Sequence, residues 1–216
     1  MKLGNKSGLF VTSMVVAALI FMGAAAPNQA DKVAQRMLKF DAALTQASTQ
    51  IDATLASMNA LSSASGADLT AKYKDYANNV KKLESMAQKA KAQSQQATAQ
   101  REQYLKQWES SNAKIQNEQL KAASQARRDE LVPKIEAIKT SLGSAKEAFG
   151  PFMQDLKDLN LYLGNNLNPQ GITGASELMT KSTSAGETVK TAIAQGQAAI
   201  KDLAASISPG GAAPAK

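Results

Sequence analysis

The sequence contains no cysteine and no histidine, and aromatic residues make up only 5% of its 216 residues. These absences exclude disulfide bonds, thiol nucleophiles, imidazole acid–base chemistry and the usual zinc sites. No phosphate-binding glycine loop and no serine nucleophile motif occurs either. Carboxylates are therefore the only candidate general acids or bases, and we expect no catalytic residues, no cofactor and no metal site.

What the sequence does contain is a long apolar and small-residue stripe between residues 69 and 108. Its steps alternate between four and three residues, which places the stripe on one face of an α-helix. A helix of this length measures about 60 Å, and it needs partner helices to bury the stripe. The stripe consists of Leu69, Tyr73, Tyr76, Val80, Leu83, Ala87, Ala90, Ser94, Ala97, Arg101, Tyr104 and Trp108.

Three further stretches show the same period, and they predict helices over Asp31–Leu61, Glu118–Leu163 and Pro169–Ile207. We expect Asp68 and Asn168 to be N-cap residues, Pro169 to follow as the first helical residue, and Gly164 to end a helix in the left-handed conformation. The predicted stripe of the third stretch is Leu120, Ser124, Arg127, Leu131, Ile135, Ile138, Leu142, Ala145, Phe149, Phe152, Leu156, Leu159 and Leu163.

Proline interrupts only the third predicted helix, at Pro133 and in Gly150-Pro151. A proline inside a helix removes one hydrogen bond, so two bends that wrap this helix around the others are expected, or else two shorter helices. The last helix places Gly186 and Gly196 on its buried stripe. Glycine is reasonable there only where a bulky group packs closely, and the candidates are Phe149, Phe152, Tyr104 and Trp108.

Four amphipathic stretches with short connections predict an all-α fold, an antiparallel bundle of about four long helices with coiled-coil-type seams. The bundle spans residues 26–207, and 208–216 form a flexible tail rich in glycine and proline. Because the helices differ in length, parts of the second and third are expected to project beyond the bundle as a helix pair.

The N-terminus has the pattern of an export signal. Lys2 and Lys6 precede an apolar run from Leu9 to Met22, and small residues follow at 23–26. The run is short for a membrane span of ~20 residues, so we expect cleavage after Ala25, with an uncleaved anchor as the alternative. The expected location is the periplasm or the cell envelope of a bacterium.

The formal net charge is +7, and it falls to +5 when residues 1–25 are removed with their two lysines. The lysines are spread along the whole chain, which is typical of a solvated surface. No cluster of basic and aromatic residues accompanies them, so we do not expect nucleic-acid binding.

Several residues carry a functional interpretation beside a structural one. Asp155 and Asp158 lie three apart and form either an acid–base pair or a solvated pair. Arg127 and Arg101 fall on stripe positions, where each either sends its head group to the rim or binds an acidic group within the bundle. Trp108 with Tyr104 forms core or a ligand-stacking surface. The Leu161–Leu163 run forms either a bundle end or a binding site.

Short patterns at four places are similar to those of a known family. They are Asp68-Leu69 with Ala71 and Tyr73, Trp108-Glu109, Leu120-Lys121 with Ser124, and Tyr162-Leu163 with Asn166-Leu167-Asn168 and Ile172. In order and spacing they resemble the bacterial family catalogued as domain of unknown function 2959, over residues 66–172. The resemblance implies an exported, all-helical protein with heptad-type repeats, and it brings no catalytic residues. Members often carry a lipid-attachment cysteine, which this chain lacks.

Together these features favour a non-enzymatic protein, a structural or adaptor module of the bacterial cell envelope. A protein partner or self-association is expected, because the seams are long and in places polar. The alternative is a binder of anionic lipid or cell-wall polymer through a weakly basic helical surface. An enzyme that uses Asp155 or Asp158 is the third hypothesis, and proximity alone supports it.

Overall fold

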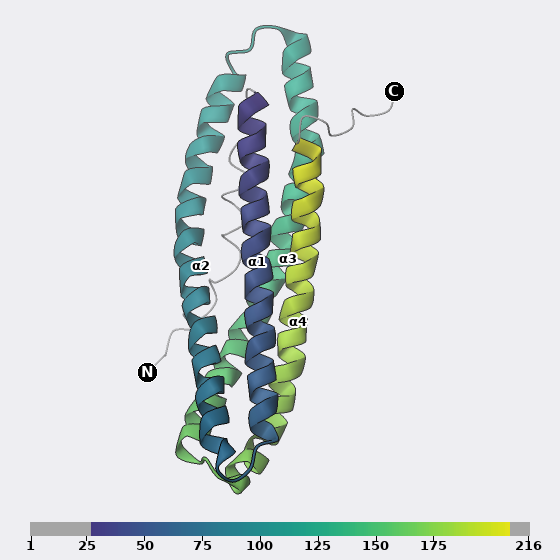
Figure 1. The fold of residues 1–216 in the computed structure, drawn as a ribbon. Coiled ribbons are helices and arrows are strands. Elements are labelled where there is room, and N and C mark those ends of the chain that lie inside the picture. Colours follow the sequence, from purple (N-terminus) through teal and green to yellow (C-terminus); the bar gives the residue numbers. More distant parts are fainter. Residues whose placement is uncertain (1–26, 208–216) are drawn as a thin grey trace, which may run out of the picture.

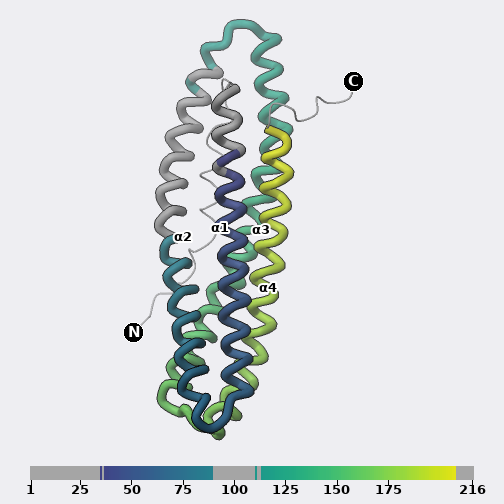
Figure 2. Tube along the Cα trace, viewed as in Figure 1, coloured from purple at the N-terminus to yellow at the C-terminus, as the bar shows by residue number. Residues whose placement is uncertain are grey.

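The chain forms four long helices that run alternately up and down in an elongated bundle (Figure 1). They are α1 (Pro27–Ser62), α2 (Asp68–Asn112), α3 (Glu118–Asn165) and α4 (Pro169–Ile207). This computed structural model describes the backbone of residues 27–207, and the side chains of 35, 37–89, 110 and 113–207 (Figure 2). The predicted signal peptide at 1–25 and the tail at 208–216 lie outside the described residues. The all-α prediction is confirmed.

The helices pack in a ring in which α1 contacts α2 and α4, and α3 contacts α4 and α2. Of these four interfaces, as far as the described residues show them, the α3–α4 interface is the most extensive and the α2–α3 interface is the smallest. The buried residues follow the predicted stripes. The core includes Met37, Phe40, Leu44, Ile51, Leu55 and Met58 of α1, Leu69, Tyr76, Val80 and Leu83 of α2, Leu131, Ile138, Leu142, Phe152, Leu156 and Leu163 of α3, and Met179, Val189, Ile193, Ile200 and Leu203 of α4.

The predicted stripe of α3 fails at its N-terminal end. Leu120 is 62% exposed, and Arg127 is exposed as well. The reason is that α4 does not extend along the whole length of α3. Arg127 contacts Ser206 in the last turn of antiparallel α4, so earlier residues of α3 extend past the end of α4 (Figure 1). The spacing of the apolar residues identified one face of α3, but it could not show that α4 does not cover the N-terminal end of that face.

The prolines do not divide α3 into two helices, because one helix runs from Glu118 to Asn165 with Pro133 and Pro151 inside it. Each proline leaves the carbonyl four residues earlier without its helical partner. Those carbonyls belong to Asp129 and Glu147, which are exposed like the prolines themselves. Water can therefore satisfy them, and the helix continues.

Two of the expected helix ends are confirmed at the bonds that define them. The Asn168 side chain accepts a hydrogen bond from the Gly171 backbone N–H at 2.9 Å, and Pro169 is the first helical residue. The third helix begins at Glu118, as predicted, and Asn117 is its N-cap, with a side chain that accepts a hydrogen bond from the Leu120 N–H at 3.1 Å. These bonds satisfy backbone donors that have no partner within the helix.

Two other expected ends are wrong. Asp68 is the first residue of α2 rather than its N-cap, and its carboxylate still favours the positive end of the helix dipole there. Gly164 lies inside α3, which ends at Asn165 with Asn166 as its C-cap. The glycine instead accommodates Tyr73, because a Cβ at this position would lie 2.6 Å from the Tyr73 hydroxyl. Gly66 has the left-handed conformation, φ 57°, in the α1–α2 turn.

The two seam glycines of α4 permit close packing, as expected. A Cβ at Gly186 would lie 2.8 Å from Leu55 Cδ1 and 3.3 Å from the Phe152 ring. A Cβ at Gly196 would lie 2.6 Å from Leu142 Cδ2. Phe152 was among the predicted neighbours, whereas the two leucines were not.

Candidate functional site

At the α1–α2 turn end of the bundle, two tyrosines fasten α2 to α3. Tyr76 is fully buried, and its hydroxyl donates a hydrogen bond to the Leu156 carbonyl at 2.8 Å. One turn away, the Tyr73 hydroxyl donates to the Asn160 carbonyl at 3.0 Å. Burial, and to a lesser extent the nearby Tyr73, raises the pKa of the Tyr76 phenol well above its ordinary value. Tyr76 is therefore a neutral donor with a structural role.

The carboxylates of Asp155 and Asp158 occupy different environments. Asp155 is 15% exposed and pairs with Lys181 of α4, whose Nζ lies 2.9 Å from Oδ2. Asp158 is exposed and accepts a hydrogen bond from the Gln154 side chain at 2.9 Å. General acid–base catalysis by two carboxylates depends on environments that separate their pKa values at a substrate site. The two carboxylates therefore have different partners, a lysine of α4 for Asp155 and a glutamine of the same helix for Asp158.

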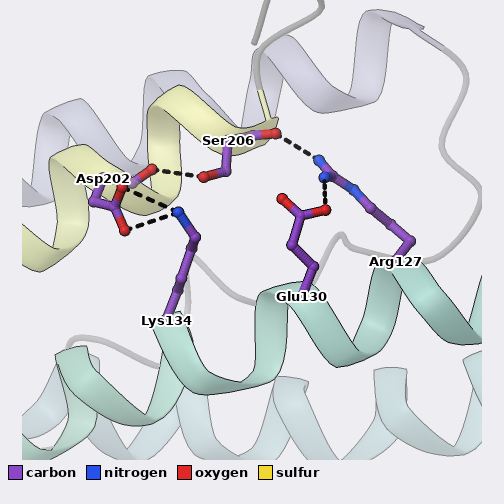
Figure 3. A network of polar contacts seen from close by, with 5 residues as sticks. All are labelled: Arg127, Glu130, Lys134, Asp202 and Ser206. Atoms are coloured by element: carbon purple, nitrogen blue, oxygen red, sulfur yellow. Dashed lines mark hydrogen bonds and ion pairs between the residues drawn. The ribbon is translucent and has the colours of Figure 1, made fainter. Parts of the chain in front are cut away.

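Arg127 belongs to a polar network that joins the end of α4 to α3 (Figure 3). Its guanidinium donates to Glu130 Oε2 at 2.6 Å and to the Ser206 carbonyl at 2.5 Å. Lys134 pairs with Asp202 at 2.9 Å, and the Ser206 hydroxyl donates to the Asp202 carbonyl. Carbonyls in the last turn of a helix have no helical donor, and a cation there is favourable. Arg127 therefore lies at the rim, as the first interpretation predicted, and it stabilises the C-terminal end of α4.

Polar contacts also fix α1 against both of its neighbours. The Gln197 amide of α4 donates to Asp41 Oδ1 at 3.0 Å and to Thr45 Oγ1 at 2.9 Å. Towards α2, the Gln50 amide donates to Asn79 Oδ1 at 3.1 Å. Satisfied polar groups at a helix interface favour one register over its alternatives. These contacts therefore set how α1 is aligned in the bundle.

The Leu161–Leu163 run is divided between core and surface. Leu163 is fully buried, while Leu161 is 68% exposed and Tyr162 is also exposed. Tyr162 lies over Gly174 of α4, where a Cβ would come within 2.8 Å of its hydroxyl. The run thus closes one end of the bundle and leaves a single leucine on the outside.

The sequence did not reveal which lysines form ion pairs and which do not. The lysines of α3 and α4 form ion pairs with carboxylates, except Lys146. The paired lysines are Lys121, Lys134, Lys139, Lys157, Lys181, Lys190 and Lys201. The five α2 lysines in the described part of the chain are exposed and form no ion pair: Lys72, Lys74, Lys81, Lys82 and Lys89. The seven-residue spacing from Lys74 to Lys81, and from Lys82 to Lys89, is a signal that could have identified this face.

Some predicted candidates cannot be placed. The side chains of residues 90–109, which include Arg101, Tyr104 and Trp108, lie outside the described residues. Among the residues that are described, no group of acidic side chains is arranged to hold a metal ion. No helix in that part of the chain is both long and apolar enough to cross a membrane.

The family described as "Protein of unknown function (DUF2959)" matches residues 22–208, and the chain belongs to it. The match confirms the resemblance seen in the sequence and extends it to the first and last helices. No curated protein and no solved structure matches the chain. Family membership therefore comes without an assigned activity.

Proposed function

We propose that this member of the DUF2959 family is a non-catalytic structural or adaptor module of the bacterial cell envelope. The observation that carries the proposal is that polar side chains between the helices form contacts from one helix to the next. Tyr76, Gln50, Gln197 and Lys134 each join one helix to another. These contacts hold the four helices together in an elongated body (Figure 1), and α3 alone, with 48 residues, measures roughly 70 Å.

The place of action rests on the N-terminal sequence. The basic start, the apolar run and the small residues at 23–26 are the features of an export signal. An exported rod offers long exposed helix faces to a protein partner or to a second copy of itself. Leu38, Leu120 and Leu161 are apolar side chains available on such faces.

Site-specific photocrosslinking in intact cells, followed by fractionation, tests this function. A photoreactive residue is placed at Leu38 or Leu161, and the exposed Glu177 is the matched control position. We expect the chain in the envelope fraction, starting at residue 26, with a crosslinked product from at least one of the leucine positions. Recovery only from the cytosol with residues 1–25 retained, or no product from either leucine position, would contradict the proposal.

The absence of catalysis has its own test. A gene that carries both Asp155→Asn and Asp158→Asn is expected to complement a deletion strain as well as the wild-type gene does. The control is Asp129→Asn, another exposed acidic residue of α3. Failure of the double variant to complement, with its fold and its level in the cell unchanged, would favour the enzyme hypothesis.

A second candidate function is contact with an anionic lipid or cell-wall polymer. The α2 lysines that form no ion pair among the described residues favour it, because no neighbouring carboxylate there offsets their positive charge, which therefore attracts an external anion. This candidate is compatible with the first, since an adaptor also needs an attachment surface.

A further inference from the structure

Four lysines of α2 share the face opposite its buried seam. Successive helix residues are turned by about 100°, which places Lys74, Lys81, Lys82 and Lys89 away from the side that carries Tyr76. We call these four residues the α2 lysine face. At about 1.5 Å per residue, the face extends over roughly 22 Å.

The α2 lysine face keeps its charge. Its lysines are exposed and form no ion pair in the described part of the chain. Of the nearby carboxylates on the same helix, Asp75 lies at the edge of the face, and Glu84 is held by Lys157 of α3 at 2.5 Å. The remaining residues of the face, Ala71, Asn78 and Ser85, are small or uncharged.

The helix that carries this face is held in place. Behind it, the Tyr76 hydroxyl bonds to Leu156, and the Asn79 side chain accepts from Gln50 of α1. The Glu84–Lys157 pair is a third attachment, to α3. The part of α2 that carries the four lysines is therefore attached to α1 and α3 on one side, and α2 lies on the outside of the bundle (Figure 1).

We propose that the α2 lysine face binds the surface of an anionic phospholipid bilayer, so that the bundle lies on its side with α2 against the headgroups. This inference rests on the second candidate function above. Four lysines along one face of a supported helix can contact a planar anionic surface together, and the favourable free energies of the single lysines then add. A flexible polymer would instead lose conformational entropy to follow the same face. Because the face carries no large apolar side chain, binding is electrostatic and requires no insertion.

Vesicle co-sedimentation of the full chain, in the form recovered from cells, tests the proposal. The vesicles contain phosphatidylcholine alone or phosphatidylcholine with phosphatidylglycerol. The test variant carries Lys74→Gln, Lys81→Gln, Lys82→Gln and Lys89→Gln. The control variant loses the same number of charges from other helices, through Lys121→Gln, Lys139→Gln, Lys181→Gln and Lys201→Gln. Circular dichroism confirms that both variants are folded, and any contribution of residues 1–25 is common to all three proteins.

We expect the wild type and the control to bind only the vesicles with phosphatidylglycerol, and to dissociate at high ionic strength. Each lysine near the surface changes partitioning about fivefold, so the test variant, which lacks four, should bind roughly 600-fold more weakly than the wild type. Equal loss in test and control variants, or binding unaffected by salt, overturns the proposal. So does displacement of the wild type from vesicles by soluble polyphosphate at matched phosphate concentration, which identifies a polymer as the ligand.

The two proposals fail separately. If the crosslinking experiment places the chain in the envelope with a protein partner and the vesicle experiment shows no binding, only the lipid inference is wrong. If vesicles bind through the α2 lysine face while the chain remains in the cytosol, the envelope function is wrong.

Discussion

The hydroxyl of Tyr76 in α2 donates a hydrogen bond to the main-chain carbonyl of Leu156 in α3, at 2.8 Å and out of contact with water. This bond lies between α2 and α3, which form the smallest of the four interfaces of the ring among the described residues. It connects a side chain to a carbonyl of continuous helix, so a shift of α2 along α3 would leave a buried donor without a partner. Tyr76 therefore fixes the register of α2.

Replacing Tyr76 with phenylalanine tests the strength of this bond. The ring remains, so the packing is conserved and only the hydrogen bond is lost. We expect the free energy of unfolding to fall by about 1 kcal/mol, measured by urea denaturation. Tyr73→Phe is the matched control, and it should cost less because Tyr73 is only partly buried. A larger loss from Tyr73→Phe would contradict the assignment.

Tyr76 also predicts a dependence of stability on alkaline pH. Its pKa is raised in the folded protein, so the unfolded chain loses this proton first as the pH rises. Above a pH of about 10 the native state binds more protons than the unfolded state, and stability falls by up to about 1.4 kcal/mol per pH unit. Lysines titrate in the same range, so the measurement is the difference between wild type and Tyr76→Phe. If the wild type and the variant lose stability in parallel, the tyrosine is not the source.

The close contact at Gly186 predicts that alanine at this position destabilises the protein. The added Cβ would meet Leu55 and Phe152 in the core, and overpacking typically costs 1–3 kcal/mol. Alanine gains ~1 kcal/mol of helix propensity, so Gly186→Ala should lower stability by about 1 kcal/mol net. Gly174→Ala is the control, because the only close neighbour there is the exposed Tyr162 side chain, which can move. That variant should keep or raise the melting temperature.

Alanine in place of Ser182 is expected to have the opposite effect, and not to lower stability. The Ser182 hydroxyl is buried, and it has no hydrogen-bond partner among the residues that the structure describes. Removing such a group recovers its desolvation cost, so Ser182→Ala should leave stability unchanged or raise it by about 1 kcal/mol. Thr54→Val is the comparison, because the buried Thr54 hydroxyl donates to the Gln50 carbonyl at 2.7 Å. We expect this second variant to be destabilised, and a loss in the serine variant would indicate an unseen partner.

The sequence predicted much of the fold because the buried face and the start of a helix depend on residues that are close together in the sequence. Periodic apolar residues identified the buried face of each helix, and Asn168 with Pro169 marked the start of α4. Gly164 was misinterpreted because a glycine near a turn has two explanations. The local pattern suggested a left-handed helix end, whereas the actual reason is the Tyr73 hydroxyl, which belongs to another helix. The exposure of Leu120 likewise depends on where a distant helix ends.

The candidate site was less predictable. Lysine positions along one helix indicate a face, but they do not show whether carboxylates of other helices neutralise it. Lys134 and Lys190 find partners at Asp202 and Asp52, far away in the sequence. Lys81 and Lys82 find none in the described part of the chain. Only the placement of the helices separates the two groups.

The sequence by itself determined that this protein consists of long helices, and which side of each one is buried. These properties follow from the period of the helix and the removal of apolar surface from water. Tertiary structure alone decided which helices are neighbours, how far they overlap and which charges remain unpaired. These depend on contacts between residues that are distant along the chain, and no local pattern records such distances.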